Sequence, residues 1–278
     1  MSAGIVAVTR LASCLRAQNP GPMTLEGTNA WLLRAPGHEG VVVVDPGPDL
    51  PEHVQALAAA GTVELVLITH RHGDHTEAVD ALHRLTGAPV RAALPEHCRD
   101  ARPLRDGERV GAAGVELEVL ATPGHTSDSL SFRVLDDAPL PSTEPGALPA
   151  VGGSFTSVLT APILTGDTVL GRGTTMLDHP DGTLADYLGS LDRLEAASAG
   201  GPGLPAHGAP IPDLAAVCRD LRRHRLERLE EVRAAVAELG EDATAAQLAA
   251  RIYPQVPDRV RPAAEKSIEA QLAHLRGA

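Results

Sequence analysis

The stretch Thr69-His70-Arg71-His72-Gly73-Asp74-His75 decides the fold of this 278-residue chain. It follows the apolar run 63–68, whose β-branched and leucine residues predict a buried strand. In an extended segment, residues two apart point the same way, so His70 and His72 can direct their imidazoles at one point. The chemistry of the chain is therefore expected where a strand ends and turns into a helix.

The turn after this strand carries two more side chains of the kind that bind metals. Asp74 and His75 lie where a helix over 76–82 is expected to open, and Gly73 permits a backbone conformation that a side chain would hinder. Three imidazoles and one carboxylate within six residues are the ligands that zinc and similar borderline metals prefer. The alternative is a set of surface histidines in a polar turn, but such clustering directly behind a hydrophobic strand is rarely accidental.

The pattern His-x-His-x-Asp-His at the end of a strand resembles the first metal motif of the metallo-β-lactamase superfamily. The resemblance implies further ligands, and later strands end in suitable residues. His125 follows the alternating segment 115–120. In isolation it would be a turn histidine, but beside the central motif it matches the next ligand of the superfamily. Asp167 matches the bridging carboxylate, and His207 matches the last imidazole.

By this resemblance, the candidate ligands form a binuclear centre. One metal is bound by His70, His72 and His125, the second by Asp74, His75 and His207, and Asp167 bridges the two. The implied cofactors are two divalent ions, above all zinc, although manganese and iron accept the same ligands. Two ions about 3.5–4 Å apart share a hydroxide and make it a nucleophile near neutral pH. The catalytic side chains would be Asp167, which joins the ions, and Asp74, which orients the hydroxide and accepts a proton.

Asp45 follows four consecutive valines, 41–44, that predict a strand buried on both faces. Two interpretations of Asp45 stay open. It caps the turn Asp45-Pro46-Gly47, or it stands behind a ligand histidine, where a carboxylate fixes the tautomer and raises the basicity of the imidazole. By resemblance it matches the leading aspartate of the superfamily, which supports the metal-binding loop.

The wider pattern predicts an α/β protein. Strands are expected over 5–11, 30–33, 41–44, 63–68, 89–93, 115–120, 129–135 and 158–165, and helices over 50–60, 76–82 and 184–197. The resemblance implies that these elements form a four-layer αββα sandwich, the metallo-β-lactamase fold, as a hydrolase domain over residues 1–210.

Three helices are expected after this core, over 214–239, 244–253 and 262–275. They are similar to the small winged-helix-like domain that the β-lactamase-like protein 2 family carries at its C-terminus, which places this domain over residues 211–278. The same family resemblance is carried by Asn19-Pro20-Gly21-Pro22, by Leu25-Glu26-Gly27-Thr28-Asn29, by the segment 166–171 and by His224-Arg225.

Composition limits the partners and the compartment. The formal charge of −12 argues against a surface generally built for nucleic acid, because phosphate binding needs a positive field. Cys14, Cys98 and Cys218 are odd in number and widely spaced, which indicates small apolar fillers in a reducing compartment. Neither a membrane span nor a signal-peptide pattern is evident. We therefore expect a cytoplasmic protein without a membrane partner; a homodimer is compatible with the sequence.

Three functions fit the predicted centre. The first is hydrolysis of a small acyl, thioester or lactone substrate, and the second is cleavage of single-stranded RNA, because members of the resembled family do either. The third is metal-dependent binding without catalysis, which would require a broken ligand set. The arginine-rich segment 219–233 either contacts phosphates or forms a solvated face of i,i+4 ion pairs. Aromatic residues make up only 2% of the chain, so few side chains are available to stack on bases.

Two loops bear on access to the site. Residues 136–157 hold several prolines and glycines without an apolar period, which predicts a long surface loop that is either an inert insertion or a flap over the site mouth. Residues 171–175 follow Asp167 and either line the pocket or form a plain loop.

Overall fold

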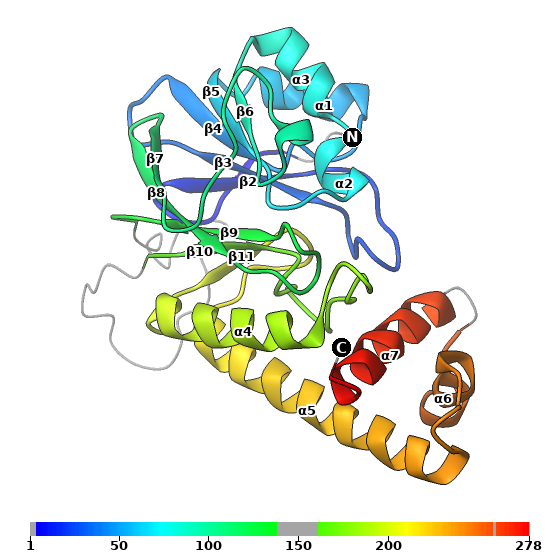
Figure 1. Ribbon diagram of the computed structural model, residues 1–278. Helices are drawn as coiled ribbons and strands as arrows, with labels where there is room; N and C mark the ends of the chain where they lie inside the picture. The colour runs from blue at the N-terminus through cyan, green and yellow to red at the C-terminus, as the bar shows by residue number, and fades with distance from the viewer. Residues whose placement is uncertain (1–3, 138–160, 258–259, 278) are drawn as a thin grey trace.

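A computed structural model describes residues 4–137, 161–257 and 260–277 of the chain (Figure 1). Its core is a pair of β-sheets. The first sheet has the strand order β1 Val6–Ala7, β2 Ala12–Arg16, β3 Asn29–Leu33, β4 Gly40–Val44, β5 Thr62–Leu67 and β6 Val90–Arg91. The second has the order β11 Gly203–Pro205, β10 Ile163–Gly166, β9 Leu130–Val134, β8 Val115–Ala121 and β7 Arg109–Ala112.

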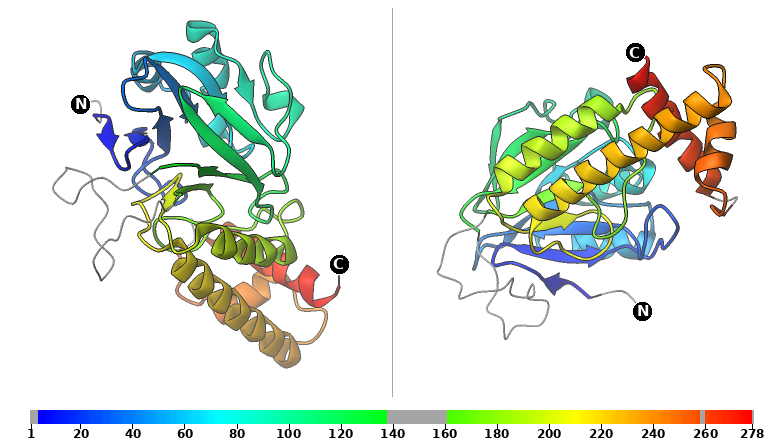
Figure 2. Two further views of the ribbon diagram at one scale, coloured as in Figure 1. Left: turned by 90° about the vertical axis from the view of Figure 1, so that its left-hand side faces the viewer. Right: turned by 90° about the horizontal axis from the view of Figure 1, so that it is seen from below.

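Helices cover the outer face of each sheet (Figures 1 and 2). The first sheet carries α1 Pro51–Ala58 and α3 Val79–Thr86, and the short α2 Gly73–Thr76 lies between β5 and α3 in the chain. The second sheet carries α4 Leu184–Ser198 and the beginning of α5 Leu214–Leu239. The predicted four-layer αββα sandwich is therefore confirmed.

The four valines of β4 show how the sequence builds two apolar layers at once. Side chains alternate along a strand, so Val42 and Val44 enter the core between the two sheets, whereas Val41 and Val43 face the helices α1 and α3. All four are fully buried. A central strand of this kind gives the histidine-rich turn after its neighbour β5 a buried base.

The C-terminal region consists of α5, α6 Ala245–Ile252 and α7 Arg261–Leu275. Leu214 and Leu221, in the first half of α5, pack in one cluster with residues of α4. Val232, in its second half, packs with Leu248 of α6 and Ile268 of α7. The region from α5 to α7 is called the tail below. Because α5 belongs to both clusters, it anchors the tail to the sandwich, and the boundary after residue 210 stays a prediction.

Several sequence-based boundaries differ from the structure. The strand expected over 5–11 is shorter in the structure, where it is β1 Val6–Ala7, because the hydroxyl of Thr9 accepts from the backbone N–H of Ala12 at 2.9 Å and the chain turns there between β1 and β2. The helix expected over 76–82 is divided into α2 and α3. Strands β2, β7 and β11 were not predicted. The loop expected over 136–157 lies outside the described residues from residue 138 on. Among the described helices, none has the length and apolar character needed to cross a membrane.

Candidate metal centre

Four strand ends meet at one edge of the sandwich and bring all seven predicted ligands together. They group as three sets of possible metal ligands: His70, His72 and His125; Asp74, His75 and His207; and His70, His75 and Asp167, each set with its ligand atoms within 4.8 Å of one another. The first histidines follow β5, His125 follows β8, Asp167 follows β10 and His207 follows β11. The turns that sequence reasoning singled out separately thus converge on one place.

The first set has the spacing of a tetrahedral nitrogen site. His72 Nδ1 lies 3.0 Å from His70 Nε2 and 3.0 Å from His125 Nε2. Nitrogen ligands about 2.0–2.1 Å from a tetrahedral ion lie roughly 3.3–3.4 Å apart along the edges of the tetrahedron. The three imidazoles therefore lie within a few tenths of an ångström of the spacing that one tetrahedral ion requires.

The second set faces the first across Asp167. His207 Nε2 lies 3.2 Å from Asp74 Oδ2, and His75 Nε2 lies 3.5 Å from the same oxygen. Asp167 turns Oδ1 toward His207 and His75, at 3.3 and 3.6 Å, and Oδ2 toward His125, at 3.7 Å. One carboxylate thus presents an oxygen to each set, which is the placement that a bridging ligand needs.

Unpaired polar atoms test whether these residues suit a metal. His75 Nε2, His207 Nε2 and Asp167 Oδ1 are buried and have no hydrogen-bond partner. A buried polar atom without a partner costs about 1–3 kcal/mol, so native structures rarely keep several in contact. A cation between them would satisfy all three atoms, and the donor set of imidazole and carboxylate suits zinc, iron or manganese. The residues present fit a metal centre.

The outward-facing nitrogens of the same histidines are all engaged. His75 Nδ1 lies 2.9 Å from Asp45 Oδ2, and His207 Nδ1 lies 3.2 Å from the carbonyl oxygen of Gly27. His70 Nδ1 lies 3.1 Å from the hydroxyl of Thr69. An acceptor behind Nδ1 keeps the proton on that atom and leaves Nε2 free for a metal.

Asp45 stands behind the centre, as one of its two interpretations predicted. Its side chain is 1% exposed, and Oδ1 accepts from the backbone N–H of Thr69 at 2.8 Å. Oδ2 accepts from the hydroxyl of Thr69 at 2.7 Å and lies against His75. The backbone of Asp45 is left-handed, with a φ of 54°. This strained position aims the carboxylate into the core instead of at the turn.

Charges at the centre oppose one another strongly. Burial disfavours a proton on His75, but the carboxylates of Asp45 and Asp167 outweigh it and raise the pKa of His75 to about 9. Burial likewise disfavours a proton on His207, but the carboxylate of Asp167 outweighs it and raises the pKa of His207 to about 10. Burial raises the pKa of Asp167, but the charge of His207 holds it well below the ordinary value. The carboxylate of Asp167 is therefore ionised, and it draws positive charge into the cluster.

Comparison with known proteins identifies the family. A family model described as the metallo-beta-lactamase superfamily matches residues 23–138, and one described as the beta-lactamase associated winged helix domain matches residues 244–277. The lactamase-like protein vrtG of Penicillium aethiopicum is 31% identical over 275 residues, which cover 91% of this chain and 78% of that protein. The chain belongs to the metallo-β-lactamase superfamily.

Other relatives agree with a hydrolase of this superfamily. A beta-lactamase-like protein 2 homolog of Caenorhabditis elegans is 28% identical, over 97% of this chain and 84% of that protein. The atrochrysone carboxyl ACP thioesterase dmxR1 of Cryptosporiopsis sp. (strain 8999) is 29% identical over 78% of this chain, and the match spans 62% of that thioesterase. The predicted β-lactamase-like protein 2 resemblance is confirmed.

Solved structures show the same fold. A beta-lactamase domain protein from Burkholderia ambifaria superposes with a TM-score of 0.75 at 24% identity, over 98% of this chain and 88% of that chain. TTHA1623, solved in a di-iron-bound form, superposes with a TM-score of 0.52 at 24% identity, over 70% of this chain and 92% of that chain.

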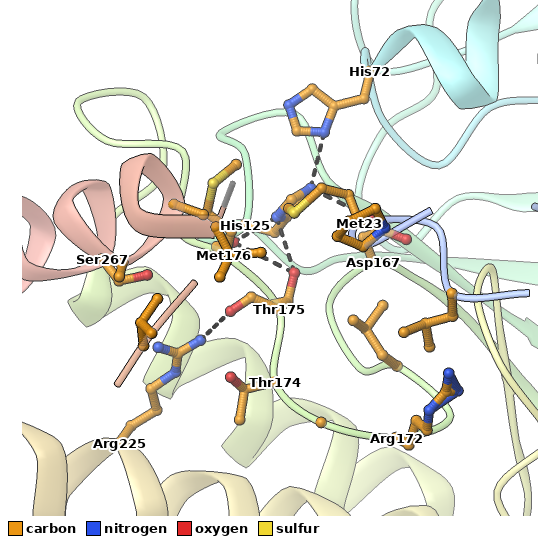
Figure 3. A pocket seen from close by; sticks show the side chains of 18 of the residues that line it. Met23, His72, His125, Asp167, Arg172, Thr174, Thr175, Met176, Arg225 and Ser267 are labelled. Carbon is orange, nitrogen blue, oxygen red and sulfur yellow. Dashed lines mark hydrogen bonds and ion pairs between the residues drawn. The ribbon is translucent and has the colours of Figure 1, made fainter. Parts of the chain in front are cut away.

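A pocket of about 790 Å³ opens over the superfamily's metal motif in this chain (Figure 3). Asp74, His125 and Asp167 line it. Residues 172–175 line it too, which is one of the two interpretations left open for the segment 171–175. The C-terminal region forms the opposite wall, through Tyr253, Val256, Val260, Ala263, Ala264 and Ser267. The site is thus shared between the sandwich and the tail, which sequence reasoning treated as separate domains.

Sequence reasoning missed the residues that contact the ligands from outside. Asp178 Oδ2 lies 3.5 Å from His72 Nε2. The carbonyl of Met176 lies 2.6 Å and the hydroxyl of Thr175 lies 3.0 Å from His125 Nδ1. No motif marks these residues, because their contacts join segments that are 50 to 106 positions apart in the chain. Thr175 was noted only as part of the loop 171–175, without a contact to a ligand.

Proposed function

We propose that this protein is a binuclear metal hydrolase that cleaves a small acyl substrate, with an acyl thioester as the favoured class. The observation that carries the proposal is the inward-facing set of seven ligand side chains, in which buried nitrogen and oxygen atoms lack partners. Two divalent ions bound there supply Lewis acidity and lower the pKa of water to near neutrality.

The chain's own residues have distinct tasks in this proposal. Asp167 holds its two oxygens toward both ligand sets, which fixes the spacing of the centre. The side chain of Asp74 is 28% exposed and lines the pocket, so it can orient an attacking water and accept its proton. A thiol has a pKa of about 8.5, so a thiolate can leave without a separate acid. This suits a pocket in which neither Asp74 nor Asp167 is kept protonated.

Two features support an acyl substrate over RNA. Val256, Val260 and Ala264 form an apolar part of the pocket wall opposite the metal motif, next to Arg225 and Arg228 of α5, which line the same pocket. Tyr253 is the one aromatic side chain among the described residues that line this pocket. An acyl chain gains from apolar burial, whereas RNA recognition relies on cations and stacking surfaces.

The arginine-rich segment 219–233 also argues against phosphate binding. Most of its arginines are paired with carboxylates: Arg219 with Glu195, Arg222 with Asp192, Arg223 with Asp220, Arg228 with Glu231 and Arg233 with Glu230. Ion pairs of this kind neutralise the positive field that a nucleic acid would need. They support the solvated-face interpretation of this segment.

The test is a substrate panel on the purified chain. Protein loaded separately with zinc, manganese or iron is assayed against acyl thioesters, lactones and unstructured RNA, and bound metal is measured by elemental analysis. We expect two zinc ions per chain and thioester hydrolysis that is lost in Asp74→Ala and His75→Ala. Asp80→Ala, an exposed carboxylate six residues from Asp74, is the matched control and should retain activity.

The outcomes separate the alternatives. Hydrolysis that survives in Asp74→Ala is contamination. Cleavage of RNA without turnover of any thioester or lactone overturns the acyl substrate and leaves the metal centre standing. Full metal loading without any hydrolysis would favour the binding protein. Zinc as the metal, a cytoplasmic location and a homodimer stay predictions.

A further inference from the structure

The C-terminal helices reach two of the metal-ligand candidates through short relays. In the first relay, Arg225 of α5 donates to the backbone carbonyl of Thr175. The hydroxyl of Thr175 lies 3.0 Å from His125 Nδ1, and the carbonyl of the next residue, Met176, lies 2.6 Å from the same nitrogen. Figure 3 shows Arg225, Thr175, His125 and His72 in one continuous line of contacts.

Arg225 is an unusual residue to find at this position. It is 4% exposed, its Nε has no hydrogen-bond partner, and its guanidinium lies 5.1 Å from the centre of the Tyr187 ring. Among the described residues, no carboxylate pairs with it, in contrast to its neighbours on α5. A buried charge costs several kcal/mol unless its contacts compensate, so the bond to Thr175 holds the guanidinium to one orientation.

The second relay starts at Lys266 of α7, the one lysine in the sequence. Its Nζ lies 2.5 Å from Asp178 Oδ1. The other oxygen of Asp178 lies 3.5 Å from His72 Nε2 and 2.6 Å from the guanidinium of Arg71. Lys266 thus helps to hold the carboxylate that stands behind His72, much as Asp45 stands behind His75.

Both relays end on the same set of ligands. His72 and His125 belong to the set that also contains His70. The histidines of the other set are held without the tail, because His75 lies against Asp45 and His207 against the carbonyl of Gly27. The tail therefore contacts one metal position from outside and leaves the other to the sandwich.

We propose that Arg225 and Lys266 are positioning residues by which the C-terminal helices set the metal affinity of the His70, His72 and His125 position alone. The inference rests on the proposed binuclear function. Residues behind a ligand fix its ring orientation and tautomer, and their loss typically weakens metal binding about 10- to 100-fold. The docking of the tail on the sandwich thereby affects how tightly one of the two ions is bound.

The test isolates each metal position before the relays are cut. His207→Ala disables the Asp74, His75 and His207 position, and His70→Ala disables the other. Arg225→Met and Lys266→Met are then introduced into each background. Zinc affinity is measured by competition with a chromogenic chelator, so the result does not depend on activity. In the His207→Ala background, each relay variant should weaken the remaining ion about 10- to 100-fold. In the His70→Ala background, affinity should change by less than about threefold, because distant sites act additively.

Controls separate positioning from a general loss of structure. Arg222→Met removes an arginine from the same helix that pairs with Asp192, and Arg251→Met removes an exposed ion pair in the tail. Neither should change zinc affinity in either background. Arg225→Lys and Lys266→Arg should restore part of the lost affinity. Thermal unfolding of the metal-free variants checks that each chain is folded.

Three results would overturn the inference. Equal losses in both backgrounds would mean that the tail supports the whole site without selecting one position. Unchanged affinity in the His207→Ala background would mean that the relays do not act on the ligands. A wild-type chain that binds fewer than two ions would overturn the proposed function, and this inference with it, whereas the first two results leave the proposed function standing.

Discussion

Replacing Asp45 by asparagine should invert the tautomer of the neutral His75 ring, the form that can bind a metal. Asparagine tolerates the left-handed backbone at this position, where φ is 54°, so the chain need not move. Its carbonyl oxygen can accept from the backbone N–H of Thr69 as Oδ1 does now, at 2.8 Å. The amide NH₂ then takes the place of Oδ2, which lies 2.9 Å from His75 Nδ1. Because NH₂ only donates, Nδ1 must become an acceptor, and the proton moves to Nε2, the nitrogen that faces Asp74 and Asp167.

Two magnitudes follow from this geometry. Asp45 Oδ2 receives contacts from the Thr69 hydroxyl and from His75, and hydrogen bonds to a charged group contribute about 1.5–3 kcal/mol each. Since the amide regains part of this, the free energy of unfolding of the metal-free protein should fall by about 2–4 kcal/mol at pH 7. Zinc affinity at the position of His75 should fall about 10- to 100-fold.

The assay is chelator competition combined with urea denaturation of the metal-free protein. Asp213→Asn makes the same chemical change at the N-cap of α5, where asparagine caps as well as aspartate, so it should alter neither quantity. Asp45→Asn with two zinc ions bound at wild-type affinity would refute the reasoning. A larger loss at the other ion would also refute it, because Asp45 contacts His75 directly and reaches His70 only through the hydroxyl of Thr69.

Three further predictions concern stability. Gly166→Ala should lower the free energy of unfolding by about 1–3 kcal/mol in urea, because φ is 51° and a Cβ would lie 2.8 Å from Thr69; an unchanged midpoint would contradict this. Burial raises the pKa of Glu108, but the hydrogen bond from Arg91 outweighs burial and leaves the pKa below its ordinary value of 4.5. The ion pair with Arg91 therefore stabilises the fold above pH 4.5, and this stabilisation is lost as the pH falls through the folded pKa. Glu108→Gln should therefore cost ~1 kcal/mol at pH 7 and nothing in strong acid, and a deficit independent of pH would count against the ion pair. Thr244→Ala removes the capping-box hydroxyl of α6 and should destabilise that helix by about 1 kcal/mol, measured as faster amide hydrogen exchange. Amide protection equal to that of the wild type would disprove the role of the cap.

The fold was largely predictable where side-chain pattern and burial agree. The unbroken valine run of β4 and the alternation of β8 both indicate strands, and the helices after residue 210 have apolar spacing. Strands β7 and β11 lacked such a pattern. Strand β11 is three residues long and contains Pro205, so its pairing with β10 depends on the tertiary structure. The position of such a short strand is determined by the strands it pairs with, and its own sequence gives almost no signal for it.

The ligand set was predictable because every candidate follows the end of a strand, beside a glycine or a turn, and four of them follow the same strand, β5. His125 and Asp167 needed the family resemblance, since a lone turn histidine or aspartate is usually only a cap. The relays through Arg225 and Lys266 had no sequence signal, because they depend on how α5 and α7 dock on the sandwich. Docking of this kind emerges only from the packed structure.

Anomalous diffraction at the zinc edge, from crystals of the zinc-loaded chain, tests the central claim most directly. Two peaks about 3.5–4 Å apart are expected, one among His70, His72 and His125, the other among Asp74, His75 and His207, with Asp167 between them. A single peak, or peaks away from these side chains, would contradict the binuclear centre.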